Sequence, residues 1–156
     1  VHDPTLIILD KPFTGLDPIN SRMIQDEIYR LRNNGVTILF STHRMEQVEE
    51  MCENIILINH GKNILMGNVK EIQNRYKENL FRVNYQGTLP TSFSGGLELV
   101  STADHTATFR IPSQDSPNHL LQHLIQTGCQ IHGFEEILPS INDIFITQVK
   151  GTSHEK

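Results

Sequence analysis

The chain has 156 residues, 37% of them hydrophobic, so it can bury one modest core or two small ones. Its net charge of −5 and pI near 5.9 argue against a nucleic-acid-binding surface, and no run of basic residues reverses that balance. No stretch of the sequence approaches the roughly 18 apolar residues of a membrane helix, so any membrane connection is expected to run through a partner chain.

The first predicted element is a short strand at residues 6–9. This run is apolar, too short for a helix, and ended by Asp10 and Pro12, which is typical of a parallel strand buried on both faces. Ligands gather at the carboxyl ends of the strands in an open α/β sheet. The Asp10 carboxylate is therefore well placed to reach a magnesium ion on the phosphates of a nucleotide.

A second strand of the same sheet is predicted at residues 36–40. It is apolar and β-branched, and it runs through Ser41 and Thr42 into His43. The His43 imidazole would then lie at the same edge of the sheet as Asp10. The two strand ends together form the predicted site.

Two helices are predicted around this second strand. Asp17 as the N-cap and Pro18 at the first position begin a helix over residues 18–33, and Gly35 ends it. The other helix covers about residues 45–52. Its glutamates are interpreted as a solvated face rather than a cation site.

A hairpin and a bridging helix follow. Apolar runs at residues 54–59 and 62–66 flank His60 and Gly61, which suits a tight turn. A short helix over about residues 68–77 then leads into a segment of different periodicity.

Beyond residue 78, apolar and polar residues alternate, as in the half-buried strands of an antiparallel sheet. Strands are predicted at about residues 81–85, 97–101, 106–111 and 130–137, with helices that begin at Ser116-Pro117 and Pro139-Ser140. The sequence thus predicts an α/β unit at residues 1–78, a small α+β domain at residues 79–150, and a polar, disordered tail at residues 151–156.

Two sequence motifs contain the residues predicted at the sheet edge. They are LIILDKPFTGLDP at residues 6–18 and VTILFSTHRMEQVEEMCENIILINHGK at residues 36–62. In this order and spacing they resemble the Walker B strand, D-loop and switch-histidine loop of ABC transporter ATP-binding subunits. The resemblance covers about residues 1–78 and implies the second half of a P-loop NTPase nucleotide-binding domain.

The resemblance also implies roles for single residues. Asp10 would be the Walker B acid that serves Mg²⁺, usually through water, and His43 would be the switch histidine that senses the γ-phosphate of ATP. Gly15, Leu16 and Asp17 would form the D-loop. In this family the D-loop faces the second ATP-binding subunit when two copies sandwich ATP.

One position departs from the pattern of the family. The residue after the Walker B acid is normally a glutamate that polarises the attacking water, and here it is Lys11. An ammonium has three donors and no acceptor, so it cannot orient a water by accepting its hydrogen bond. Phosphates nearby would favour the charged form of the lysine. Hydrolysis is therefore expected to be crippled even in the full-length protein.

The chain is expected to be a fragment, because it enters a core strand almost directly after Val1. A P-loop, Gly-x-x-x-x-Gly-Lys-[Ser/Thr], supplies the backbone amides and the lysine that hold phosphates, and none occurs in this sequence. The Q-loop and signature motif of the family would also lie upstream. This chain alone should therefore bind ATP weakly and leave it unhydrolysed.

The closing stretch LPSINDIFI, residues 138–146, resembles the end of the accessory domain of many bacterial export-type ABC ATPases, in the drug and sodium-efflux branch. This second resemblance covers about residues 79–150. It implies an accessory or regulatory role for that domain.

Together the resemblances imply the ATP-binding and ATP-hydrolysing subunit of an ABC-type exporter. It would use ATP and Mg²⁺, drive a partner permease, and lie in the cytoplasm, peripheral on the inner face of the cell membrane. The alternative, suggested by Lys11, is a degenerate nucleotide-binding domain whose C-terminal domain is a regulatory or dimerisation module. An ABC ATPase acting on ribosomes or DNA is disfavoured by the acidic charge and the efflux-like ending.

A pair of histidines, His119 and His123, stands at the i, i+4 spacing that can ligate one metal ion. Only Asp115 offers a third ligand nearby. An exposed helical face is therefore the preferred interpretation.

Overall fold

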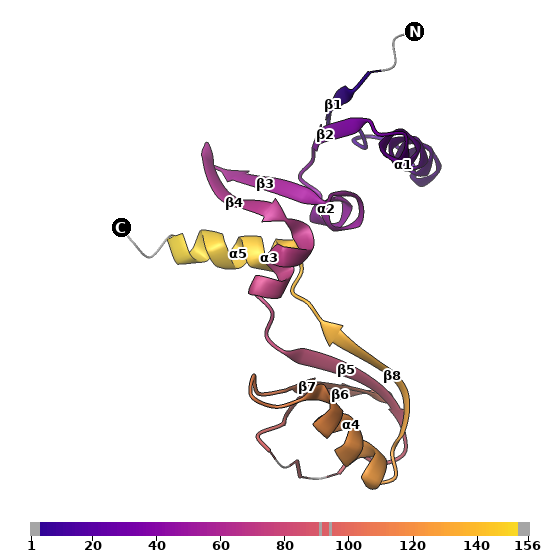
Figure 1. The fold of residues 1–156 in the computed structure, drawn as a ribbon, viewed down its shortest axis with the longest axis vertical. Helices are drawn as coiled ribbons and strands as arrows, with labels where there is room; N and C mark the ends of the chain where they lie inside the picture. The colour runs from indigo at the N-terminus through magenta and orange to yellow at the C-terminus, as the bar shows by residue number, and fades with distance from the viewer. Residues whose placement is uncertain (1–3, 91, 94, 153–156) are drawn as a thin grey trace. The chain divides into compact units, whose positions relative to one another are not determined.

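The computed structural model describes residues 4–90, 92–93 and 95–152. Contacts divide the chain into two compact units, Val1–Cys52 and Glu53–Lys156. The elements of both are labelled in Figure 1. Among the described residues, no helix is both long and apolar enough to span a membrane.

The first unit is a β-α-β arrangement with one further helix. Strands β1 (Leu6–Asp10) and β2 (Thr37–Ser41) pair in parallel, and α1 (Pro18–Asn33) makes the crossover between them. Helix α2 (Met45–Met51) follows β2. The two predicted strands and two predicted helices are thus confirmed.

The core of the first unit lies on one side of the strand pair. Phe13, Ile28 and Met51 are buried there. On the other side Leu6, Ile8 and Leu39 are 52%, 69% and 56% exposed. The prediction that the first strand is buried on both faces is wrong for this chain. A parallel strand needs cover on both sides, and the described elements of this unit cover only one.

The second unit begins with an antiparallel hairpin of β3 (Asn54–Asn59) and β4 (Lys62–Asn68), as predicted. His60 and Gly61 both have positive φ angles, 47° and 73°. Two consecutive residues of this kind make the type I′ turn, whose twist matches that of the flanking strands. Helix α3 (Val69–Arg75) follows and is capped by the Asn68 side chain.

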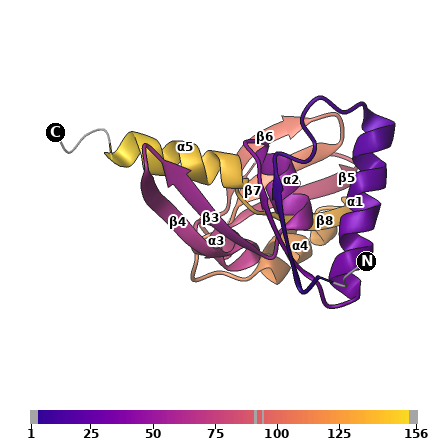
Figure 2. The ribbon, with the colours of Figure 1, turned by 90° about the horizontal axis from the view of Figure 1, so that it is seen from above.

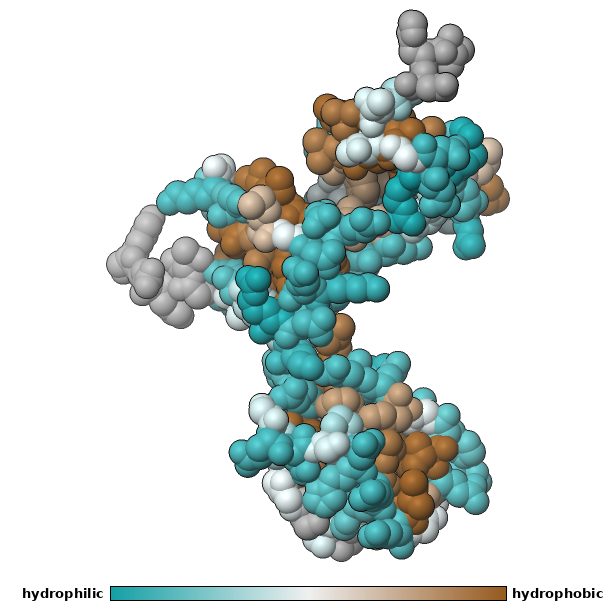
Figure 3. Space-filling model, viewed as in Figure 1, coloured by the Kyte–Doolittle hydropathy of each residue, from teal (hydrophilic) through white to brown (hydrophobic). Residues whose placement is uncertain are grey.

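The hairpin has one covered face and one open face. Ile55, Leu57 and Leu65 are buried. On the opposite face Ile56, Ile58 and Met66 are all at least 60% exposed, and apolar surface is visible over this region in Figure 3.

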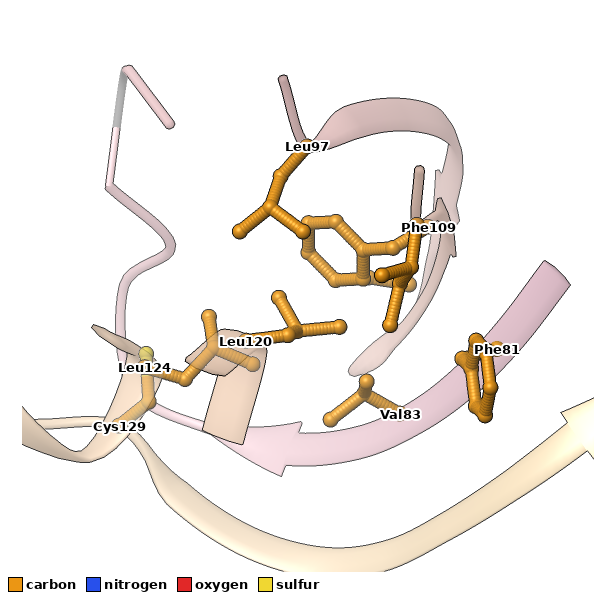
Figure 4. Close-up of a cluster of buried hydrophobic side chains, with 9 residues drawn as sticks. Phe81, Val83, Leu97, Phe109, Leu120, Leu124 and Cys129 are labelled. Carbon is orange, nitrogen blue, oxygen red and sulfur yellow. The ribbon is translucent and has the colours of Figure 1, made fainter. Parts of the chain in front are cut away.

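A four-stranded antiparallel sheet forms the next part of this unit. Its order is β6-β7-β5-β8, built from β5 (Leu80–Gln86), β6 (Glu98–Ala103), β7 (Thr106–Arg110) and β8 (Gln130–Ile137). Helix α4 (Pro117–Gln126) packs on one face, where Leu120 and Leu124 meet Val83 and Phe109 (Figure 4). All four side chains are fully buried. The predicted α+β arrangement is confirmed. The first unit of the chain is of the α/β class, and the second contains a small antiparallel sheet with a helix packed on it.

The last helix, α5 (Ile141–Thr152), returns to α3 rather than to this sheet. Gln73 Nε2 donates a hydrogen bond to the carbonyl of Pro139 at 3.2 Å, and Ile141 and Ile144 are buried. Figures 1 and 2 both show α5 beside the β3–β4 hairpin. The helix includes residues 151 and 152, so the prediction of a disordered tail is wrong for these two residues. Residues 153–156 of the predicted tail lie outside the described part of the chain.

The domain boundary expected near residue 78 stays a prediction, since the contact between α3 and α5 runs across it. Residues 76–79 belong to no helix or strand. Limited trypsin digestion should therefore cut after Lys77 before it cuts either core. The two products should stay associated on a native gel, because α5 remains docked on α3. A full-length core that resists trypsin throughout would contradict a boundary at this position.

Candidate functional site

The candidate site lies where β1 and β2 end. Asp10 is the last residue of β1 and Ser41 the last of β2, and the two are register partners in the parallel pair. Parallel strands present their carboxyl ends at one sheet edge, so Asp10 and the loop after Ser41 meet there. Both residues are exposed.

Ser41 ties the two strand ends together through its side chain. Its hydroxyl donates a hydrogen bond to Oδ1 of Asp10. The backbone N–H of Lys11 donates to Ser41 Oγ at 3.1 Å and to the Ser41 carbonyl at 3.2 Å. One serine thus contacts both residues that the sequence singled out at the end of β1.

Lys11 begins the turn that follows β1. Its φ angle is 45°, and its carbonyl accepts a hydrogen bond from the Thr14 N–H at 3.1 Å. This left-handed backbone ends the strand directly after Asp10, while Phe13 anchors the turn in the core. The Lys11 residue is exposed, next in the chain to the Asp10 carboxylate.

The loop that carries His43 is fastened to α2. Thr42 Oγ1 donates to Gln47 Oε1 at 2.9 Å and accepts the Arg44 N–H at 3.1 Å. Gln47 is 8% exposed, so its amide is a buried anchor for the loop. His43 itself is exposed and lies two residues beyond Ser41.

The predicted D-loop residues precede α1. Gly15 has a φ of 77°, which favours glycine, and Leu16 is 37% exposed. Asp17 caps the helix as predicted, since its Oδ1 accepts the N–H groups of Ile19 and Asn20 at 2.9 and 3.0 Å. The backbone hydrogen bond from Asn20 is the main cause that lowers the pKa of the Asp17 carboxyl below its ordinary value.

This cap gives a pH-dependent prediction. Because the folded-state pKa of Asp17 is depressed, its contribution to stability is present above the unfolded pKa and is lost as the pH falls through the folded value. Asp17→Asn keeps the acceptor but not the charge. The midpoint of thermal unfolding should fall less with decreasing pH in this variant than in the unmodified chain. Identical pH profiles for both proteins would contradict a charged cap.

The donor set at the sheet edge suits magnesium bound together with a nucleotide. Within the described ranges, no group of three or more His, Cys, Asp or Glu side chains is arranged to hold a metal ion. Mg²⁺ is commonly held by one or two carboxylates, waters and substrate phosphates rather than by an all-protein cage. The exposed Asp10 carboxylate fits that chemistry.

The two histidines of α4 have separate partners. His119 Nδ1 lies 3.0 Å from Asp115 Oδ2, whereas the ring of His123 lies 5.7 Å from the ring of Phe93. The hydrogen bond to His119 is the main cause that lowers the pKa of the Asp115 carboxyl. His119 is exposed, as expected for a solvated helical face, whereas His123 is half-buried.

Two residues of the site were not singled out from the sequence. They are Ser41, whose hydroxyl meets Asp10, and Gln47, which fastens the loop before α2. The signal for Ser41 is its position, because a hydroxyl at the end of the neighbouring parallel strand is within reach of a carboxylate at the end of the first. Gln47 carries no such signal, since it stands among the polar residues of a short helix.

Comparison with known proteins identifies the family. Residues 67–149, just over half of the chain, match the model described as "ATP-binding protein DrrA1-3-like, C-terminal domain". The chain belongs to this family of ABC transporter ATP-binding proteins. The sequence-based resemblance to the export branch is thereby confirmed.

Individual relatives of this ABC family match nearly the whole chain. The uncharacterized ABC transporter ATP-binding protein YhaQ of Bacillus subtilis is 38% identical over 151 residues, which cover 96% of this chain and 50% of the relative. A fluoroquinolones export ATP-binding protein of Mycobacterium tuberculosis is 32% identical over 150 residues, 94% of this chain and 44% of the relative. The chain spans about half the length of the curated relatives it matches.

Among solved structures, an ATP-binding subunit of an ABC transporter is similar to 47% of this chain. The matched part is 31% of that structure, at 28% identity and a TM-score of 0.44.

Proposed function

We propose that this chain is part of the ATP-binding subunit of an ABC-type export transporter, and that the edge formed by β1 and β2 contributes to a Mg-ATP site. The family of the chain is established by the comparisons above, and one structural observation supports the proposal. A carboxylate and a histidine-bearing loop stand at the ends of two paired parallel strands and are joined through Ser41. Strand ends of this kind are where α/β folds bind nucleotides.

Asp10 would hold the magnesium ion that accompanies the nucleotide. Its carboxylate is an oxygen ligand of the type that Mg²⁺ prefers, directly or through water. When bound, Mg²⁺ would neutralise negative charge on the phosphates. In the structure this carboxylate accepts a hydrogen bond from the Ser41 hydroxyl.

His43 would report on the γ-phosphate. An imidazole can donate a hydrogen bond to a phosphate oxygen, and the loop that carries it is held by the bond between Thr42 and the buried Gln47. A fixed loop keeps the imidazole within reach of one phosphate position, so that ATP and ADP would be told apart.

The Lys11 ammonium would interact with negatively charged groups rather than activate a water molecule. This group is a donor and cannot accept a hydrogen bond from an attacking water. We propose that the native full-length subunit binds Mg-ATP but hydrolyses it slowly at this site.

The partners of the proposed subunit are a permease and a second ATP-binding subunit. Gly15, Leu16 and Asp17 form an exposed turn ahead of α1, which suits a contact with another subunit. The proposed location is the cytoplasm, on the inner face of the cell membrane, where a permease would hold the subunit.

Lys11 also favours a second candidate. In that case the nucleotide region is degenerate, and the part of the chain built on β5 to β8 and α4 acts as a regulatory or dimerisation module. The two candidates differ in whether the full-length protein binds Mg-ATP.

Isothermal calorimetry on the full-length protein and on this 156-residue chain separates them. The full-length protein should bind Mg-ATP in the micromolar range. This chain should bind at least about tenfold more weakly, because its sequence has no phosphate-holding P-loop. A full-length protein that does not bind Mg-ATP would overturn the proposed function and favour the module.

A further inference from the structure

From the contacts at the sheet edge we infer that Ser41 is the positioning residue for Asp10. Its hydroxyl holds Oδ1 of the carboxylate and so assigns Oδ2 to the magnesium ion or its bound water. This inference rests on the proposed function, and it adds a residue that the family resemblance did not name.

The direction of the hydrogen bonds follows from the donor inventory. A serine hydroxyl has one proton and two lone pairs, and an ionised carboxylate only accepts. The Lys11 N–H occupies a lone pair of Ser41 Oγ at 3.1 Å. The hydroxyl proton therefore goes to Asp10 Oδ1, as a charge-assisted bond of the stronger class.

The backbone of Ser41 is fixed by hydrogen bonds on both sides of the residue. Ser41 is the last residue of β2, and its carbonyl accepts the Lys11 N–H at 3.2 Å. On the other side Thr42 is bound to Gln47, which is 8% exposed. A hydroxyl fixed in this way can orient a neighbouring carboxylate, whereas a serine on a loose loop cannot.

The side-chain bond is not needed to join the strands. The backbone ladder already pairs β1 with β2 from Leu6 and Thr37 to Asp10 and Ser41. Asp10 and Ser41 are also both exposed, so the bond buries no polar group. Removing the hydroxyl should leave the fold intact and free the carboxylate to rotate.

The test measures magnesium affinity in the full-length subunit rather than turnover. Binding of a fluorescent ATP analogue is followed while Mg²⁺ is titrated, and again with the metal chelated. Ser41→Ala should raise the Mg²⁺ concentration for half-maximal binding by about 10-fold or more, as is typical when an outer partner of a metal ligand is removed. Affinity for the analogue without metal should not change.

Two further variants separate positioning from a structural effect. Ser41→Thr keeps the hydroxyl and should restore most of the magnesium affinity. Thr37→Ala removes a hydroxyl from the other end of the same strand and should match the unmodified protein.

Each contrary outcome has a distinct meaning. Magnesium dependence in Ser41→Ala equal to that of the unmodified subunit overturns the role of Ser41 alone. An equal loss in Ser41→Thr or in Thr37→Ala also overturns it, since the effect would then not follow the hydroxyl at this position. An unmodified subunit that binds no Mg-ATP overturns the proposed function and this inference with it.

Discussion

Replacing Lys11 by glutamate in the full-length subunit should raise the rate of ATP hydrolysis by about 10²–10⁴-fold. The change puts a hydrogen-bond acceptor where an ammonium donor now stands, directly after Asp10. The residue has a φ of 45°, and neither lysine nor glutamate is β-branched, so the backbone should accept the exchange without new strain. Phosphate release at saturating Mg-ATP, with and without the permease, measures the effect.

Two controls belong to this experiment. Lys11→Ala removes the charge without adding an acceptor and should not restore the rate. His43→Ala in the Lys11→Glu background should lower turnover again, because the proposed γ-phosphate contact is lost. Brisk turnover by the native subunit, unchanged by Lys11→Glu, would show that the water is activated elsewhere.

Replacing Phe109 by alanine should lower the free energy of unfolding of the second unit by about 3–5 kcal/mol. The Phe109 side chain is fully buried on β7, and its ring centre lies 5.0 Å from that of Phe93. Its removal would leave a cavity beside Val83 and Leu120 that the sheet and α4 cannot fill by small shifts. Urea unfolding followed by far-ultraviolet circular dichroism measures the loss.

Val100→Ala is the matched control for Phe109→Ala. Val100 lies on the edge strand β6 and is 44% exposed, so its truncation should change the free energy of unfolding by at most about 0.5 kcal/mol. Equal effects of the two substitutions would contradict a packed core centred on Phe109.

Local elements were predictable because their determinants are local. Asp17 and Pro18 predicted the start of α1, and Ser116 with Pro117 predicted that of α4. His60-Gly61 predicted the tight turn between β3 and β4, and the alternation from residue 81 predicted β5. Each signal acts through capping, backbone conformation or face periodicity within a few residues.

The docking of α5 was not predictable in the same way. Its apolar residues, among them Ile141 and Ile144, indicate that one face is buried but not which element covers it. The sequence predicted this helix as part of the α+β domain at residues 79–150, and in the structure it contacts α3, which precedes that range. The periodicity of a sequence shows that a helix face is buried, but it does not show which distant element packs against that face.

The candidate site was predictable in its location and incomplete in its detail. Asp10 and His43 were expected at one edge because parallel strands end together. The bond between Ser41 and Asp10 depends on the register of β1 against β2, which a single sequence does not specify. The burial of β1 was predicted wrongly, since Leu6 and Ile8 are exposed. An apolar strand has an open face when no described element of its unit packs against that face.

The most direct test of a Mg-ATP site at this edge compares the dissociation constants of the full-length subunit for Mg-ATP and Mg-ADP, before and after His43→Ala. The unmodified subunit should prefer ATP. The variant should lose about tenfold or more of that preference, because one hydrogen bond to a charged phosphate is removed while contacts to the other phosphates remain. An ATP-to-ADP preference unchanged by His43→Ala would contradict a γ-phosphate contact at the end of β2 and, with it, the assignment of this edge as the nucleotide site.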